Sequence, residues 1–228
     1  MCQPSHISQL TWSGEPHSVI GMLVNEKQLL WFQSAIPQSY QKGDIIYHQG
    51  EPHKGLFYIQ KGVVGIRHTT HSGREHLLRL YKCHSFFGHK ALLTHEPYFA
   101  NAFAMEPVQL LFLPKGQALE LFEKNPLFYR ELADLLAKDL ARCEIQRVMI
   151  LENQILARTA QAIVYLKEFF PNRHWTRQEI ADFIASTSTT VIKALGELER
   201  RGLIEQSGRH IIIKDREGLL AIHEDEVF

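Results

Sequence analysis

The sequence has few cysteines, no long apolar run and no net charge. Its three cysteines, Cys2, Cys83 and Cys143, are too few and too scattered for a disulfide scaffold or a paired-cysteine metal site. No apolar run approaches the ~18–20 residues that span a bilayer, and residues 1–20 have neither the basic start nor the apolar stretch of a signal peptide. We therefore expect a cytoplasmic protein with reduced thiols and no membrane partner.

The charge is balanced over the whole chain but not along it. The formal net charge is +0, so the total charge does not indicate a nucleic-acid partner. Between Arg158 and Lys214, however, nine basic residues stand against six acidic ones. That segment is mildly basic.

Short apolar runs separated by glycines predict an all-β domain in the N-terminal half of the 228-residue chain, which is long enough for two domains. The runs are rich in aromatic and β-branched residues, which is typical of strands, and they cover residues 44–47, 56–59, 63–66, 76–80 and 108–112. Glycines lie between or beside the runs, where turns need positive φ or close backbone approach. The pattern predicts a compact β-roll or barrel.

A long segment without glycine or proline predicts a helix after Asn125-Pro126. It lasts until Pro171, although residues 159–170 are expected to form a separate second helix. The first helix carries a stripe at spacings of three and four that we predict to be a dimer interface, formed by Leu132, Leu136, Leu140, Cys143, Arg147 and Ile150. The alternative is that this helix packs only on its own β-roll.

Residues 176–213 have the pattern of a winged helix-turn-helix. Thr176 and Glu179 form a capping box that begins one helix, and residues 185–187 make a polar turn before a second. Residues 202–213 then predict a two-stranded hairpin, the wing. Small polar residues and a lysine occupy the exposed start of the second helix, where a recognition helix meets bases, and Arg200, Arg201 and Arg209 are placed to hold phosphates. The predicted DNA-binding residues are Thr176, Arg177, Gln178, Ser188, Thr189, Thr190, Lys193 and Arg209.

Over almost its whole length the chain resembles the CRP/FNR family of transcriptional regulators. Residues 43–51 and 56–62 are similar to the opening strands of the family's cyclic-nucleotide-type β-roll, and Asn125-Pro126 to the start of its dimer helix. Residues 176–181 and 190–204 resemble its DNA-binding signature.

The resemblance implies an α+β fold with three parts. These are an N-terminal β-roll of the double-stranded β-helix type (1–124), a dimerisation helix (125–155) and a C-terminal winged helix-turn-helix (156–228). It also implies a homodimer on a pseudo-palindromic double-stranded DNA operator, an effector, and contact with RNA polymerase if the protein is an activator. No enzymatic activity is expected.

The effector pocket departs from the pattern of relatives that bind cAMP. Those relatives have Phe-x-Gly-Glu and Arg-Ser-Ala stretches, whereas this chain has His89 in place of the glutamate and Phe99 where the phosphate-pairing arginine should be. The Thr-Ser pair of the dimer helix is replaced by Cys143-Glu144. Without that arginine a buried phosphate loses its bidentate partner, which argues against cAMP.

Two interpretations of this pocket remain open. Either it binds another, acidic or aromatic, effector through Arg79, His89, Lys90 and Asn101, or Arg79 pairs with Glu144 and fills the pocket. The candidate pocket residues are Ile66, Leu78, Arg79, Tyr81, Gly88, His89, Lys90, Phe99, Ala100, Asn101, Cys143 and Glu144.

Metal, haem and redox functions are alternatives that the sequence does not favour. Cys2 alone cannot supply the cysteine cluster of the family's iron-sulfur sensors. Residues 83–89 offer thiolate and imidazole ligands for haem, but their spacing does not match well, and histidines crowd the β-roll without a recognised ligand pattern. No cofactor or metal site is therefore predicted. Cys143 would face its twin across a dimer axis, so redox sensing is an alternative to an inert thiol.

Three further hypotheses compete with a DNA-binding regulator. A cupin-type metalloenzyme would need two or three histidines and an acid converging inside the β-roll. A small-molecule binding module that has lost its DNA role would keep the fold but bind no specific sequence. The helical domain could also be a packing module only.

Overall fold

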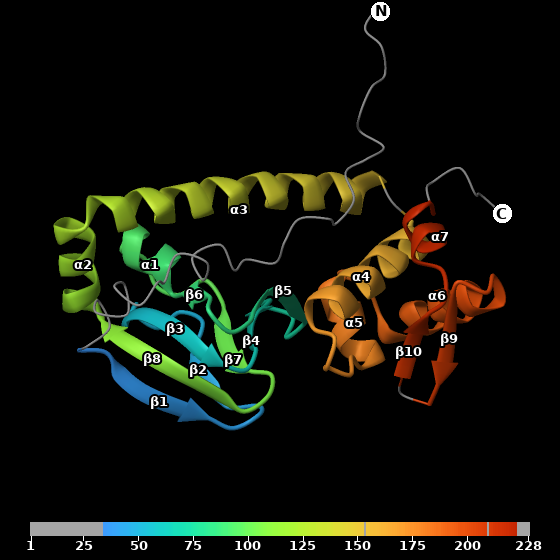
Figure 1. Cartoon of the computed structure of the whole chain (residues 1–228), viewed down its shortest axis with the longest axis horizontal. Helices are drawn as coiled ribbons and strands as arrows, with labels where there is room; N and C mark the ends of the chain where they lie inside the picture. Colours follow the sequence, from blue (N-terminus) through green and yellow to red (C-terminus); the bar gives the residue numbers. More distant parts are fainter. Residues whose placement is uncertain (1–33, 153, 209, 223–228) are drawn as a thin grey trace, which may run out of the picture. The chain divides into compact units, whose positions relative to one another are not determined.

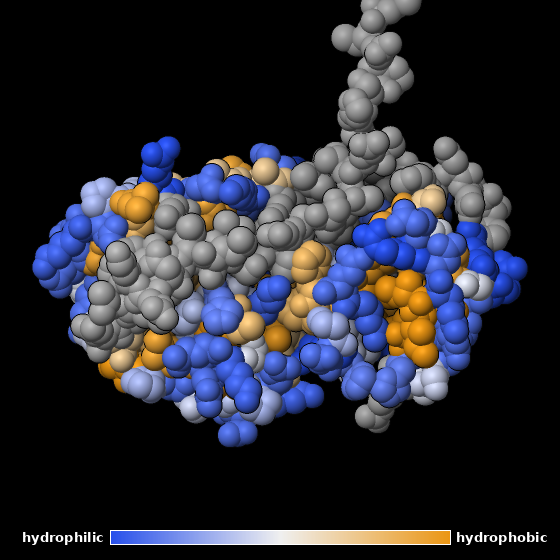
Figure 2. Space-filling model, viewed as in Figure 1, coloured by the Kyte–Doolittle hydropathy of each residue, from blue (hydrophilic) through white to orange (hydrophobic). Residues whose placement is uncertain are grey.

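The chain folds into two compact units, one reaching to Leu140 and the other beginning at Ala141 (Figure 1). The computed structural model describes residues 34–152, 154–208 and 210–222. Each unit has its own apolar core. Figure 2 shows that hydrophilic side chains cover most of the described surface on one face, with apolar side chains in separate patches over both units. The described residues contain no helix with the length and hydropathy needed to cross a membrane.

The first unit is an antiparallel β-roll of two four-stranded sheets. The strand orders are β1-β8-β3-β6 and β2-β7-β4-β5. The strands are β1 (Ile36–Tyr40), β2 (Ile45–Tyr47), β3 (Gly55–Lys61), β4 (Val64–Thr69), β5 (Glu75–Tyr81), β6 (Phe86–Phe87), β7 (Asn101–Ala104) and β8 (Val108–Pro114). The predicted β-roll and α+β class are confirmed, and the five predicted runs lie in β2, β3, β4, β5 and β8.

Aromatic side chains fill the interior of the roll. Phe57 of β3 pairs in register with Phe87 of β6 and Phe112 of β8, and its ring lies 4.8 Å from each of theirs. Gly88 follows β6 with φ +88, and a Cβ there would approach the carbonyl oxygen of Gly55 to 2.8 Å. Only glycine combines this backbone with so close an approach, so Gly88 fixes where the next helix begins.

Three helices cover one side of the roll around a second apolar cluster. They are α1 (His89–Thr94), α2 (Lys115–Lys124) and the long α3 (Pro126–Glu152), and α1 lies between the strands and α3 (Figure 1). The cluster includes Phe86, Leu92, Phe122, Phe128 and Leu132. The predicted long helix is present, but α1 and α2 were not expected.

The second unit contains the predicted helices and hairpin. They are α4 (Ile155–Phe169), α5 (Arg177–Phe183), α6 (Ser188–Arg200), β9 (Ile204–Ser207), β10 (His210–Ile213) and the short α7 (Arg216–Leu220), which was not predicted. Strands β9 and β10 pair antiparallel, with Ile204 opposite Ile213 at one end and Ser207 opposite His210 at the other. Arg158 of α4 donates to the carbonyl oxygen of Ile184 at 3.1 Å, which ties α4 to the end of α5.

Candidate nucleic-acid interface and effector cavity

Side-chain caps position the two helices of the helix-turn-helix. The Thr176 hydroxyl accepts from the Glu179 amide at 3.1 Å, and the Glu179 carboxylate accepts from the Thr176 amide at 2.8 Å, so the predicted capping box is present. After α5, Ala185 adopts a left-handed φ of 54, and the Thr187 hydroxyl accepts from the Thr190 amide to begin α6. The predicted turn and second N-cap are confirmed, and together they set the angle at which α6 leaves α5.

Helix α6 has one buried face and one exposed face. Val191, Ala194, Leu195 and Leu198 are buried in the unit's core. The exposed face presents Thr189, Ile192, Lys193 and Gly196, and a Cβ at position 196 would meet no atom within 4 Å. This is the open surface expected of a recognition helix.

Ile192 was not predicted from the sequence as a DNA-contacting residue, although its side chain is 55% exposed in the middle of the open face. An exposed isoleucine on such a surface can contact the methyl group of thymine. Its position, three residues after Thr189 and four before Gly196, was a signal that the helical spacing could have supplied.

Most of the described basic side chains of this unit form hydrogen bonds or ion pairs with other groups of the same unit. Arg200 and Arg201, expected to hold phosphates, both pair with Glu197 at 2.7 Å. Arg177 donates to the Gln206 amide oxygen at 2.7 Å and to the carbonyl oxygen of Gly208 at 3.4 Å, so it links α5 to the wing.

Lys193 is the cation that the open face leaves available. It is exposed, and no carboxylate forms an ion pair with it among residues 34–152, 154–208 and 210–222. Of the other predicted contact residues, Thr176 and Gln178 are exposed and Ser188 and Thr190 are half-buried. Arg209 lies outside the described residues.

The wing is tied to the far end of α6. The Glu199 carboxylate accepts from the Gln206 amide nitrogen at 2.6 Å and from the Gln206 side chain at 3.0 Å. Since Gln206 also accepts from Arg177, one side chain of β9 connects α5, α6 and the hairpin. The arrangement holds the wing beside the exposed face of α6.

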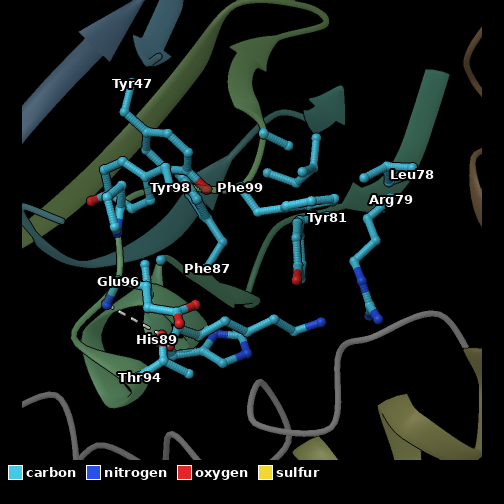
Figure 3. Close-up of a pocket in the computed structure, with 16 residues that line it drawn as sticks. Tyr47, Leu78, Arg79, Tyr81, Phe87, His89, Thr94, Glu96, Tyr98 and Phe99 are labelled. Carbon is cyan, nitrogen blue, oxygen red and sulfur yellow. Dashed lines mark hydrogen bonds between the residues drawn. The ribbon is translucent and has the colours of Figure 1, made fainter. Parts of the chain in front are cut away.

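A cavity of about 230 Å³ opens in the β-roll (Figure 3). Nine of the twelve predicted pocket residues line it, namely Ile66, Leu78, Arg79, Tyr81, Gly88, His89, Lys90, Phe99 and Ala100. Its aromatic wall includes Tyr47 and Tyr98, whose rings stack at 3.6 Å, and Phe87. Burial raises the pKa of the Tyr47 phenol well above its ordinary value, so this wall is neutral.

Two cations of the cavity meet a buried carboxylate of α3. Arg79 Nη1 lies 2.6 Å from Asp139 Oδ2, and Lys90 Nζ lies 3.5 Å from the same oxygen. The structure shows a carboxylate partner of Arg79 on α3, as one alternative predicted, but this partner is Asp139, five residues before Glu144. Asp139 was not singled out from the sequence.

Comparison with known proteins matches both units. Residues 37–125 match the profile of the cyclic nucleotide-binding domain, and residues 157–222 match that of the Crp-like helix-turn-helix domain. A transcriptional regulator of the CRP/FNR family from Thermus thermophilus is 27% identical and has the same fold, with a TM-score of 0.70 over 82% of this chain and 98% of that chain. This chain belongs to the CRP/FNR family.

Curated relatives are regulators whose printed names differ in the signal. The CRP-like cAMP-activated global transcriptional regulator of Mycobacterium tuberculosis is 24% identical over 80% of this chain and 86% of its own length. The global nitrogen regulator of Synechococcus elongatus is 27% identical over 84% of this chain and 95% of its own length. Family membership therefore identifies a transcriptional regulator without identifying what this CRP/FNR protein senses.

One predicted pocket residue of the β-roll of this CRP/FNR protein, Asn101, does not line the cavity. Asn101, the first residue of β7, accepts from the Gln49 amide at 2.9 Å and donates to the carbonyl oxygen of Arg67 at 3.4 Å, so its side chain joins the loop after β2 to strand β4. The assignment of Asn101 to the pocket is corrected accordingly. Cys143 and Glu144 are exposed residues of α3 in the unit that begins at Ala141, so their assignment to the pocket stays a prediction.

Phe99 lines the cavity, at the sequence position where relatives that bind cAMP are expected to have an arginine. Its side chain is 72% exposed and its ring stacks on His68 at 4.5 Å. The neighbouring Ala100 is buried. The exposed side chain at this rim is therefore the aromatic ring of Phe99 rather than a cation.

The predicted dimer stripe divides along α3. Leu132 is only 1% exposed because it packs in the cluster with Phe122 and Phe128, so it cannot form a dimer interface and its assignment is corrected. Leu136 is half-buried, Leu140 is 61% exposed, and Cys143 and Arg147 are exposed. The side chain of Ile150 lies outside the described part of the chain.

Within the described part of the chain, no group of three or more His, Cys, Asp or Glu residues could hold a metal ion.

Proposed function

We propose that this chain is a sequence-specific DNA-binding transcriptional regulator that binds a pseudo-palindromic operator as a homodimer and performs no catalysis. The observation that carries the proposal is the open face of α6, where Thr189, Ile192 and Lys193 are exposed beside a wing held by Gln206. Small polar, apolar and cationic groups on one recognition helix supply the contacts that base edges and phosphates require. Acting on chromosomal DNA, the protein would work in the cytoplasm.

The second half of α3 supports the homodimer. Leu140 is 61% exposed, and Cys143 and Arg147 extend the same stripe at spacings of three and four. An exposed stripe that includes Leu140 on a 27-residue helix is stabilised by a matching helix. Two recognition helices must also be held about 34 Å apart to reach successive major grooves, which a paired helix accomplishes.

The cavity of the β-roll is proposed to sense an effector other than cAMP. Phe99 offers no charge to a cyclic phosphate at the position where relatives that bind cAMP are expected to have an arginine. A buried phosphate without a charge-assisted partner is destabilised. If the protein is an activator, RNA polymerase would be its further partner.

Selection of DNA from a random pool by the purified full-length protein tests the proposal. We expect an enriched palindrome with half-sites about one helical turn apart, bound by a species of twice the chain mass in analytical ultracentrifugation. Saturating cAMP is expected to leave the affinity unchanged. Equal affinity for selected and random DNA would overturn sequence specificity, a single half-site bound by one chain would overturn the dimer, and tighter binding with cAMP would overturn the effector assignment.

A further inference from the structure

Two exposed histidines of the second unit contact each other beside the turn of the wing. The imidazole rings of His174 and His210 meet edge to face, with their centroids 4.2 Å apart and their planes at 74°. His174 lies in the loop between α4 and α5, and His210 is the first residue of β10 (Figure 1). The contact therefore joins the segment that enters the helix-turn-helix to the hairpin.

Buried neighbours fix the backbone that carries each histidine. His174 is followed by Trp175, which is 3% exposed and whose ring lies 4.7 Å from the guanidinium carbon of Arg173. His210 is followed by Ile211, which is 4% exposed and packs in the core of the unit. Because both backbones are anchored, the two imidazoles are held near each other while their own side chains stay exposed to solvent.

Two neighbouring imidazoles form a ligand pair for a late first-row transition-metal ion. A neutral imidazole binds Zn²⁺, Cu²⁺ or Ni²⁺ through one ring nitrogen. At Zn–N distances of ~2.0–2.1 Å, two nitrogens that share one ion lie about 3 Å apart. Rings that are already in contact reach this separation by rotation about χ2, for which histidine has broad energy wells.

The pair would hold an ion without further protein ligands from the described part of the chain. No group of three or more His, Cys, Asp or Glu residues gathers anywhere in residues 34–152, 154–208 and 210–222. The remaining coordination positions of the ion would therefore be taken by water, as in metal sites that keep positions open.

We propose that His174 and His210 bind one late first-row transition-metal ion, and that the bound ion strengthens the attachment of the wing to the helix-turn-helix. Arg177 already joins the same two segments, because it donates to the Gln206 amide oxygen at 2.7 Å and to the carbonyl oxygen of Gly208 at 3.4 Å. An ion shared by the two imidazoles adds coordinate bonds to this connection. The turn of the wing is then held to the start of α5 from two sides.

The ion would act on DNA binding through its charge and its open positions. Thr176, a predicted DNA contact, caps α5 two residues after His174. A bound divalent ion is often the largest local charge of a site. A phosphate oxygen of the operator can replace one of its water ligands. We therefore expect the metal-loaded protein to bind its operator more tightly. This consequence rests on the proposed function, whereas the metal site itself does not.

Zinc binding to the full-length protein, produced without a histidine tag, tests the site. Long-range proton–nitrogen NMR spectra resolve the imidazole rings, and His174→Gln and His210→Gln assign the two signals. We expect Zn²⁺ to shift both rings together, and Mg²⁺, which prefers oxygen ligands, to shift neither. Either substitution should weaken this binding by about tenfold or more and leave the other ring unshifted. His71→Gln is the matched control, because His71 is an exposed histidine between β4 and β5 of the other unit.

Fluorescence anisotropy of the selected operator, with Zn²⁺ and with EDTA, measures the effect on DNA. We expect Zn²⁺ to tighten binding by about threefold or more for the natural chain and for His71→Gln. His174→Gln and His210→Gln should show no such gain. Both variants replace exposed side chains and should fold, as circular dichroism would verify.

The outcomes separate the metal site from the regulator. A Zn²⁺ shift of only one ring or of neither, or zinc binding unchanged by both substitutions, would overturn the site. Both rings shifted with an unchanged operator affinity would overturn the effect on the wing. Equal affinity for selected and random DNA, with and without Zn²⁺, would count against the proposed function, while the NMR result would still decide the metal site.

Discussion

Replacement of Lys193 tests whether the open face of α6 reads DNA. Lys193 is exposed at the centre of that face, whereas Arg200 and Arg201 are already paired with Glu197. Lys193→Ala removes a cation from the surface without breaking an ion pair among the described residues. The fold should therefore be unaffected, and any change in operator affinity reports the contact itself.

The size of the effect follows from the contact and from the symmetry of the complex. A lysine that donates to a base contributes about 1–3 kcal/mol of discrimination. A symmetric dimer carries the residue twice, so the loss over both half-sites is about 2–6 kcal/mol by the same estimate. If Lys193 meets a phosphate instead, the loss is nonspecific, and the slope of log affinity against log salt becomes shallower by about 1 for each half-site.

The assay is fluorescence anisotropy of the selected operator and of a scrambled duplex at several salt concentrations. Lys214→Ala is the control. Lys214 is also an exposed lysine of the same unit, but its ammonium group is paired with the Glu205 carboxylate. We expect the control to match the natural chain. Unchanged affinity and unchanged salt slope for Lys193→Ala would refute the placement of this face on DNA.

Other parts of the structure make further predictions. Ile192→Ala should cost about 1 kcal/mol at thymine-containing positions of the operator, as read by repeating the selection, whereas Ile36→Ala, a similarly exposed isoleucine of the β-roll, should not. Thr176→Ala should lower the free energy of unfolding by about 0.5–2 kcal/mol in urea, and an unchanged midpoint would contradict the capping box. Burial raises the pKa of Tyr47, so the folded state keeps a proton that the unfolded state releases above about pH 10. Stability should therefore fall as pH rises beyond that point, and less so in Tyr47→Phe, as thermal unfolding at graded pH would measure.

Local signals explain what could be predicted well from the sequence. The capping box at Thr176 and the cap at Thr187 depend on residues three apart, so the helix-turn-helix was found with its boundaries. The predicted strands were those with β-branched and aromatic runs. Strand β7 (Asn101–Ala104) was missed because its alanines, buried against the partner strand, lack that signature.

The errors concern contacts between segments distant in sequence. Leu132 was assigned to a dimer stripe from its spacing, but spacing cannot tell whether a neighbour belongs to the same chain. Arg79 was recognised as a pocket cation, yet its carboxylate could be chosen only once the rotation of α3 was known. Ile192 was passed over because an apolar residue on a helix is usually assigned to the core.

The core beneath α3 also decides where the protein can be divided for separate study. A fragment ending at residue 124, the boundary expected from the sequence, would lose Phe128, Leu132 and Leu135 and expose the side chains of Phe86 and Phe122 that they cover. Such a fragment should aggregate on expression. The β-roll unit should therefore be produced as a piece ending near Leu140, where the compact unit ends and Asp139 is retained.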